Sequence, residues 1–295
     1  MSVAEDSFIS MGGEGDRIPL FLLPGGGSDP IYFYELSRHL ASNQPVYGLR
    51  PAGLDGKSTP SRSVEEAAAY HIKIIRELQA QGPYQLLGHS SGAHIAFEIA
   101  QQLMRQGDEI KLFAALDMPA PIAIHSLMQF PEKDDLQYIL DYAETMQPYT
   151  RQKLDISRET LEPLTESERM ALLKNVLEKA KLLLPETDGK YFKNILDIAR
   201  CTADMIPKYK PNNTLPLSTL LFRVTEKVHL AGSLIIPVFE QDAGWDRFGQ
   251  TKAYAIPGNH FTLVNEPHVV VLADKLKPHL ANAVDGRTGN KTDVN

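Results

Sequence analysis

The chain has 295 residues, 43% of them hydrophobic and 23% charged, and a formal net charge of −7. This composition is ordinary for a globular protein and excludes a disordered chain, a collagen and a coiled coil. The mild acidity argues against nucleic acid as the main partner. No run of 18 apolar residues occurs, so no membrane-spanning helix is expected.

The two ends of the chain are interpreted as tails around one domain. Residues 1–17 are polar and lack the basic and apolar segments of a secretory signal. Residues 283–295 contain the glycines and asparagines that are typical of a loose terminus. The domain is therefore expected over residues 18–282. A single cysteine, Cys201, allows no internal disulfide and fits a cytoplasmic location.

Short apolar runs alternate with amphipathic helical stretches, which predicts a mostly parallel sheet flanked by helices. A helix is expected to begin at Ser63, whose hydroxyl can cap the Glu66 amide while the Glu66 carboxylate reaches back to the Ser63 amide. The next helix is expected over residues 92–106, before Gly107. The predicted strands are residues 20–23, 45–49, 84–87, 112–116, 219–224 and 253–256.

The region 118–217 has helical periodicity and no convincing strand pattern. A capping box at Thr165 and Glu168 predicts a helix that Pro185 ends, and a further helix is expected over 191–206. A crossover between parallel strands needs only about a dozen residues and its turns. The whole region is therefore interpreted as a helical lid inserted into the sheet domain.

A serine motif lies between a predicted strand and a predicted helix. Residues Gly88–Gly92 read GHSSG and match G-x-S-x-G, the pattern of a nucleophile elbow. A side chain at Gly88 or Gly92 would crowd so tight a turn, and the helix N-terminus favours developing negative charge. Ser90 is the predicted nucleophile.

A serine hydroxyl becomes a good nucleophile only when a base takes its proton. In folds that carry a nucleophile elbow, the base follows the serine along the chain. His260 lies on a glycine turn just after the last predicted strand. His268 precedes an apolar helix and suits a cap or surface role. His89 and His94 flank the serine and are interpreted as packing or mouth residues. His260 is the predicted base.

The third member of the site should be an acid that orients the histidine. Asp117 directly follows the strand after the nucleophile helix. Pro119 suits the first turn of a helix, so Asp117 could instead be the N-cap of that helix. Glu226 ends the next predicted strand and is the alternative. Asp117 is preferred, and Glu226 stays open.

The glycine run after the first predicted strand is interpreted as an oxyanion turn. In a hydrolase this turn supplies a backbone N–H, here assigned to Gly26, which acts with the amide of Ser91. A phosphate-binding turn is the alternative, but no G-x-x-x-x-G-K-[ST] pattern follows. No cluster has metal-ligand spacing, so no metal is expected. Cys201 is interpreted as packing, and Trp245 as a core anchor or a pocket wall.

Together these motifs resemble the thioesterase domains of nonribosomal peptide, polyketide and fatty-acid synthases. The resemblance is strong over the first 117 residues and weak over the lid. Ala93 stands where the family usually has a second glycine, which should alter helix packing rather than chemistry. The matching segments are residues 21–27 (FLLPGGG), 47–56 (YGLRPAGLDG), 82–92 (GPYQLLGHSSG), 96–100 (AFEIA), 244–245 (GW) and 258–261 (GNHF).

The resemblance implies an α/β-hydrolase fold and an acyl substrate on the phosphopantetheine arm of an acyl or peptidyl carrier protein. It implies no metal or redox cofactor. It also favours Asp117, although some stand-alone editing relatives carry the acid one strand later, at the place of Glu226. The expected reaction passes through acyl-Ser90 and ends by hydrolysis or cyclisation. The alternatives are a free-standing esterase or lipase and a non-catalytic binding protein of the same fold.

Overall fold

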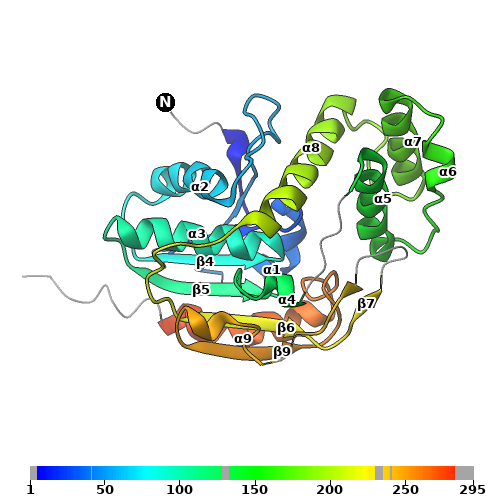
Figure 1. Cartoon of the computed structure of the whole chain (residues 1–295). Helices are drawn as coiled ribbons and strands as arrows, with labels where there is room; N and C mark the ends of the chain where they lie inside the picture. Colours follow the sequence, from blue (N-terminus) through cyan, green and yellow to red (C-terminus); the bar gives the residue numbers. More distant parts are fainter. Residues whose placement is uncertain (1–4, 41, 128–132, 230–234, 240, 283–295) are drawn as a thin grey trace, which may run out of the picture.

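The computed structural model describes residues 5–40, 42–127, 133–229, 235–239 and 241–282. A seven-stranded sheet in the order β1-β3-β2-β4-β5-β6-β9 forms its centre, and all neighbouring strands are parallel except β1 and β3 (Figure 1). A separate antiparallel pair is formed by β7 and β8. The strands are β1 Phe8–Ser10, β2 Leu20–Leu23, β3 Val46–Leu49, β4 Tyr84–His89, β5 Ile110–Leu116, β6 Thr219–Val224, β7 Val228–His229, β8 Ile235–Ile236 and β9 Thr251–Ile256.

All six predicted strands are present, and β2 and β6 have the predicted bounds. The interpretation of residues 1–17 as a loose tail is wrong at β1, which pairs with β3 through Phe8 and Leu49. A three-residue strand is too short to show a period of two, so the pairing with β3 fixes it rather than its own sequence. The predicted tail 283–295 lies outside the described residues.

Helices cover both faces of the sheet. On one face lie α2 (Val64–Leu78) and α3 (Ser91–Arg105), and on the other α1 (Tyr34–His39) and α9 (His268–Asn282) (Figure 1). Because both faces are covered, the central strands carry continuous apolar runs rather than alternating ones. Each face has its own buried cluster, one around Phe97 and Phe113 and the other around Phe222 and Leu272.

The ends of these helices follow the signals in the sequence. The Ser63 hydroxyl accepts from the Glu66 amide as predicted, but the Glu66 carboxylate accepts from the Arg62 N–H at 3.0 Å rather than from Ser63. Gly107 follows α3 with φ +91°, a conformation that favours glycine. No described helix is both long and apolar enough to cross a bilayer.

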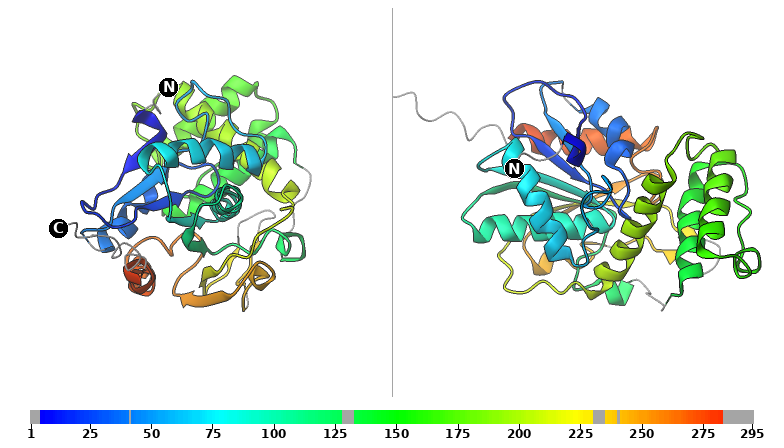
Figure 2. Two further views of the ribbon diagram at one scale, coloured as in Figure 1. Left: turned by 90° about the vertical axis from the view of Figure 1, so that its left-hand side faces the viewer. Right: turned by 90° about the horizontal axis from the view of Figure 1, so that it is seen from above.

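The lid region between β5 and β6 consists of helices joined by turns and loops, with no strand in its described residues, 118–127 and 133–217. Three of its helices, α5, α6 and α7, gather at one end of the sheet, with α8 between them and the core, while α4 lies beside the sheet (Figure 1, Figure 2). A cluster that includes Leu173, Leu177 and Phe192 gives the lid a small core of its own. The helices are α4 Ile124–Leu127, α5 Asp135–Met146, α6 Arg158–Leu161, α7 Glu166–Lys179 and α8 Gly189–Met205.

The capping box predicted at Thr165 is complete at the start of α7. However, α7 ends at Lys179 rather than near Pro185, because the backbone turns left-handed at Lys181, with φ +59°.

Candidate active site

Ser90 lies on the sharp turn between β4 and α3. Its backbone has φ +53° and ψ −132°, a conformation that non-glycine residues rarely adopt. The two glycines of the motif make the turn possible, because a Cβ at Gly88 would lie 2.2 Å from the Gly92 carbonyl oxygen and one at Gly92 2.3 Å from the Leu23 carbonyl oxygen. The predicted strand–turn–helix context is confirmed, with Ser90 directly before the helix N-terminus.

The structure brings Asp117 and His260 into direct contact. The Asp117 Oδ2 atom lies 2.8 Å from His260 Nδ1, and the Asp117 side chain is fully buried. The other carboxylate oxygen, Oδ1, accepts from the Val224 N–H at 3.1 Å, while the Asp117 N–H donates to the Phe222 carbonyl at 2.7 Å. Strand β6 therefore holds both the carboxylate and the backbone of Asp117 in place.

His260 reaches this position from the turn after β9. Gly258 has φ +89°, and a Cβ there would lie 2.6 Å from Thr262 Oγ1. The Asn259 side chain accepts from the Phe261 and Thr262 amides at 3.0 and 3.2 Å and so closes the turn. The glycine turn after the last strand is the feature that predicts His260 from the sequence.

The rival residues lie elsewhere. The Glu226 side chain is exposed, while its amide donates to the Gly258 carbonyl at 3.0 Å. His268 begins α9, in agreement with its interpretation as a helix-end residue. Asp117, and not Glu226, is thus the carboxylate that the structure places on His260.

The glycine turn after β2 lies against the serine. A Cβ on Gly25 would come within 2.7 Å of Ser90 Cβ, so this close approach requires glycine. The Gly25 N–H donates to the Tyr32 hydroxyl at 2.8 Å, and the Gly26 N–H donates to Ser91 Oγ, also at 2.8 Å. The amide predicted as the oxyanion donor is therefore engaged by a neighbouring side chain in this structure.

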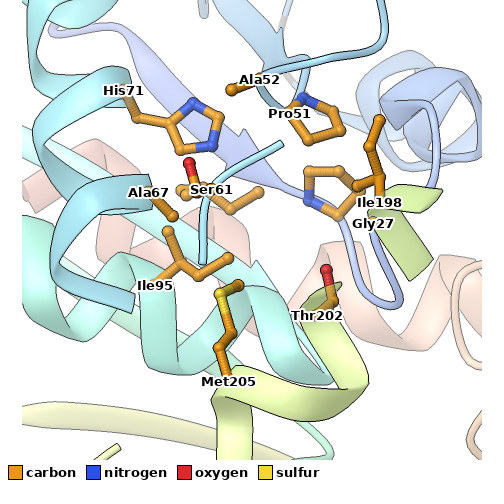
Figure 3. Close-up of a pocket in the computed structure, with 12 residues that line it drawn as sticks. Gly27, Pro51, Ala52, Ser61, Ala67, His71, Ile95, Ile198, Thr202 and Met205 are labelled. Carbon is orange, nitrogen blue, oxygen red and sulfur yellow. The ribbon is translucent and has the colours of Figure 1, made fainter. Parts of the chain in front are cut away.

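The lid helix α8 packs on the same glycine turn. Gly27 has φ +70°, and a Cβ there would lie 2.4 Å from Ile198 Cγ2 of α8. Beside this contact is a cavity of about 30 Å³, bounded by the turn, α2, α3 and α8 (Figure 3). Such a volume holds on the order of one or two waters and no acyl chain. The His71 side chain of α2 lines the cavity, and burial lowers its pKa to about 4.

Trp245 and Cys201 contribute to packing rather than to the site. Trp245 is fully buried and donates from Nε1 to the Met118 carbonyl at 2.9 Å, so it anchors the core at the start of the lid rather than lining a pocket. Cys201 is half-buried in α8, where burial raises the pKa of its thiol, and this fits a packing role.

One surface group of the described residues has atoms close enough to share a cation. His39 and Glu266 make a hydrogen bond of 2.6 Å, with Glu35 beside them. The sequence did not show this cluster, because His39 and Glu266 are far apart in the chain. Acidic groups often gather on a surface without a metal, so the cluster alone defines no site.

A serine on a strand–helix turn, with a histidine–aspartate pair from the ends of later strands, defines the α/β-hydrolase class. A family model described as "Thioesterase domain" matches residues 18–280, and the chain therefore belongs to the thioesterase domain family, a family of serine hydrolases.

Curated proteins similar to this chain include synthetases and synthases. The chain is 24% identical over 259 residues to the atromentin synthetase invA1 of Paxillus involutus, a match that covers 86% of this chain but 26% of that protein. It is 25% identical over 277 residues to the chondramide synthase cmdD of Chondromyces crocatus, covering 93% of this chain and 7% of the synthase. The chain thus spans only a small part of the relatives that it matches.

A solved structure shares the fold. The four-domain nonribosomal peptide synthetase AB3403 superimposes with a TM-score of 0.78 at 24% identity, over 92% of this chain and 20% of that one.

Proposed function

We propose that this chain is a chain-releasing thioesterase that cleaves an acyl or peptidyl thioester on the phosphopantetheine arm of a carrier protein. The observation that carries the proposal is the buried pair of Asp117 and His260, 2.8 Å apart, beside the Ser90 turn in a chain of the thioesterase family. Similarity to parts of large synthetases supports a carrier-protein partner.

In the first half of the reaction, Ser90 Oγ attacks the thioester carbonyl. Because Asp117 engages Nδ1 of His260, Nε2 is the nitrogen left to take the serine proton. The buried carboxylate then stabilises the imidazolium. Collapse of the tetrahedral intermediate breaks the carbon–sulfur bond, and His260 returns the proton to the departing thiolate. The products are acyl-Ser90 and the free pantetheine thiol.

The oxyanion of the intermediate needs backbone donors. Ser91 is the first residue of α3, and the first amides of a helix have no partner within it. We assign the Ser91 N–H as one donor. Gly26 is assigned as the second, provided that its N–H exchanges Ser91 Oγ for the oxyanion. Losing one such donor typically costs ~2.7–4 kcal/mol of transition-state stabilisation.

In the second half, His260 activates either water or a hydroxyl or amine of the bound chain. Attack on acyl-Ser90 then releases a free acid or a cyclic product and restores the serine. The protein's own groups supply every proton transfer in this scheme, and it requires no cofactor.

The proposal is tested with synthetic acyl-pantetheine thioesters, matched simple esters and a fluorophosphonate probe. We expect labelling at Ser90, faster turnover of thioesters than of esters, and complete loss of both labelling and turnover in Ser90→Ala. Mass spectrometry of the products separates hydrolysis from cyclisation. Preference for simple esters would favour an esterase instead, and an unlabelled wild-type protein would favour a binding protein.

A further inference from the structure

A chain of hydrogen bonds connects the two sides of the site through Tyr32 and His89. The Gly25 N–H donates to the Tyr32 hydroxyl at 2.8 Å, and this hydroxyl lies 3.1 Å from His89 Nδ1. The other ring nitrogen, His89 Nε2, lies 3.0 Å from the carbonyl oxygen of His260. Gly25 is the residue in contact with Ser90, so the chain joins the glycine turn to the backbone of the proposed base.

The backbone groups at the two ends, an N–H donor and a carbonyl acceptor, fix the direction of every bond. A backbone N–H can only donate, so the Tyr32 oxygen accepts from Gly25. A carbonyl can only accept, so His89 carries its proton on Nε2. His89 Nδ1 is then a free acceptor, and the Tyr32 hydroxyl donates to it. One neutral tautomer of His89 satisfies the whole chain.

The surroundings keep both residues uncharged. His89 is 5% exposed, and burial together with the nearby His260 holds its pKa well below the usual range. The rings of His89 and His260 are 4.8 Å apart, so a cation on His89 would oppose the imidazolium that forms on His260. Burial likewise raises the pKa of Tyr32. Because its Nε2 donates to a carbonyl, His89 cannot itself take the serine proton.

We propose that Tyr32 and His89 are positioning residues, which together hold the glycine turn against Ser90 and hold the backbone of His260 in register with it. The inference rests on the proposed function. Asp117 fixes only the imidazole of His260, whereas the main chain that carries the ring is held by His89. A misplacement of about 1 Å in such a site can cost roughly 100-fold in rate. Fixing the main chain of His260 is therefore important for catalysis.

The test compares thioester kinetics of wild type, Tyr32→Phe, His89→Gln and His89→Leu, with Tyr34→Phe as the matched control because Tyr34 is 51% exposed. Tyr32→Phe keeps the ring but leaves the Gly25 N–H and His89 Nδ1 without their partner. We expect kcat to fall about tenfold with KM changed less than about twofold. His89→Leu should lose at least as much, whereas His89→Gln keeps an N–H donor for the His260 carbonyl and should recover part of the rate.

Ring-nitrogen NMR supplies a readout that mere packing would not give. His89 should stay in the neutral Nε2–H form across the pH range of the kinetic assays, and circular dichroism should show the native fold in each variant. A wild type that reacts with fluorophosphonate, combined with a Tyr32→Phe variant as active as Tyr34→Phe, would overturn the positioning role alone. Protonation of His89 within that pH range would overturn it as well. A wild type that fails to react would remove the proposed function and this inference with it.

Discussion

At the scale of single residues, Asp117 combines a strained backbone conformation with a buried carboxylate. Its φ of +48° lies in the left-handed region, which aspartate tolerates better than most residues. A buried carboxylate is costly unless its oxygens are paired. Here Oδ1 and Oδ2 have the Val224 amide and His260 as partners. An acid built in this way is suited to orient a histidine.

Asp117→Asn should therefore cripple the enzyme while its shape is kept. The amide removes the charge and favours the wrong imidazole tautomer, a change that costs about 10⁴-fold in kcat in a serine protease. Steady-state turnover of an acyl-pantetheine thioester measures the loss. Glu226→Gln is the matched control and should retain nearly full activity, because its side chain is exposed. The reverse pattern would place the acid one strand later.

The sequence was informative about the site where function depends on chain order and local geometry. The motif predicts Ser90, and the places of Asp117 and His260 after predicted strands predict a pair that the structure brings into contact. Tyr32 was missed, and His89 was interpreted as a packing or mouth residue, because their roles depend on three segments meeting in space. The Gly26 amide gives the same lesson, since nothing local shows that Ser91 Oγ is its partner. Tertiary hydrogen bonds leave no periodic signal in the chain.

At the scale of elements, the contact between the glycine turn and α8 couples the lid to the site. Gly27→Ala should destabilise the protein for two reasons: a left-handed alanine costs roughly 1–2 kcal/mol, and its Cβ would overlap Ile198. Denaturant unfolding measures the loss. In an Ile198→Ala background the closest of these contacts disappears, while the Ile198 carbonyl carbon and Thr202 Oγ1 remain 3.1 Å from the new Cβ, so the same Gly27→Ala change should then cost less. Equal costs in both backgrounds would contradict the contact.

The lid should also select the acyl chain. Tyr149→Ser removes a half-exposed lid ring that packs edge-on against Phe261, the residue after His260. We expect turnover of long acyl-pantetheine thioesters to fall several-fold more than turnover of a short ester, because only a long chain reaches the lid and gains ~25 cal/mol per Å² of apolar surface that it covers there. Rates on both substrates, measured beside the melting temperature, test this. A uniform loss on the two substrates would argue against a selecting lid.

The elements themselves were predictable where a pattern was long enough. The central strands and the helix caps at Ser63 and Thr165 agree with the sequence. Short elements have no recognisable pattern in the sequence. Strand β1 has only three residues and is fixed by its pairing with β3. The predicted end of α7 is also wrong, because the left-handed residue after the helix is Lys181 rather than the glycine that usually marks a helix end.

At the scale of the whole molecule, burial of neutral histidines makes the fold sensitive to acid. His71 and His94 each have a pKa lowered by burial from 6.5 to about 4. The unfolded chain binds these protons more readily, so stability is complete above pH 6.5 and is lost as the pH falls from 6.5 towards 4. His89, also buried, contributes in the same direction.

Urea unfolding at pH 7.5 and pH 5.0 should show this loss, and each of the two histidines should account for about 2 kcal/mol of it. The His71→Leu variant isolates the part of this stability loss that is due to His71. Because His71 Nδ1 has no hydrogen-bond partner, an apolar side chain of similar size should be tolerated at pH 7.5. The variant should then lose about 2 kcal/mol less than wild type on acidification, since its site no longer takes up a proton on unfolding. Parallel losses in the two proteins would mean that His71 binds its proton equally well in the folded and unfolded chain.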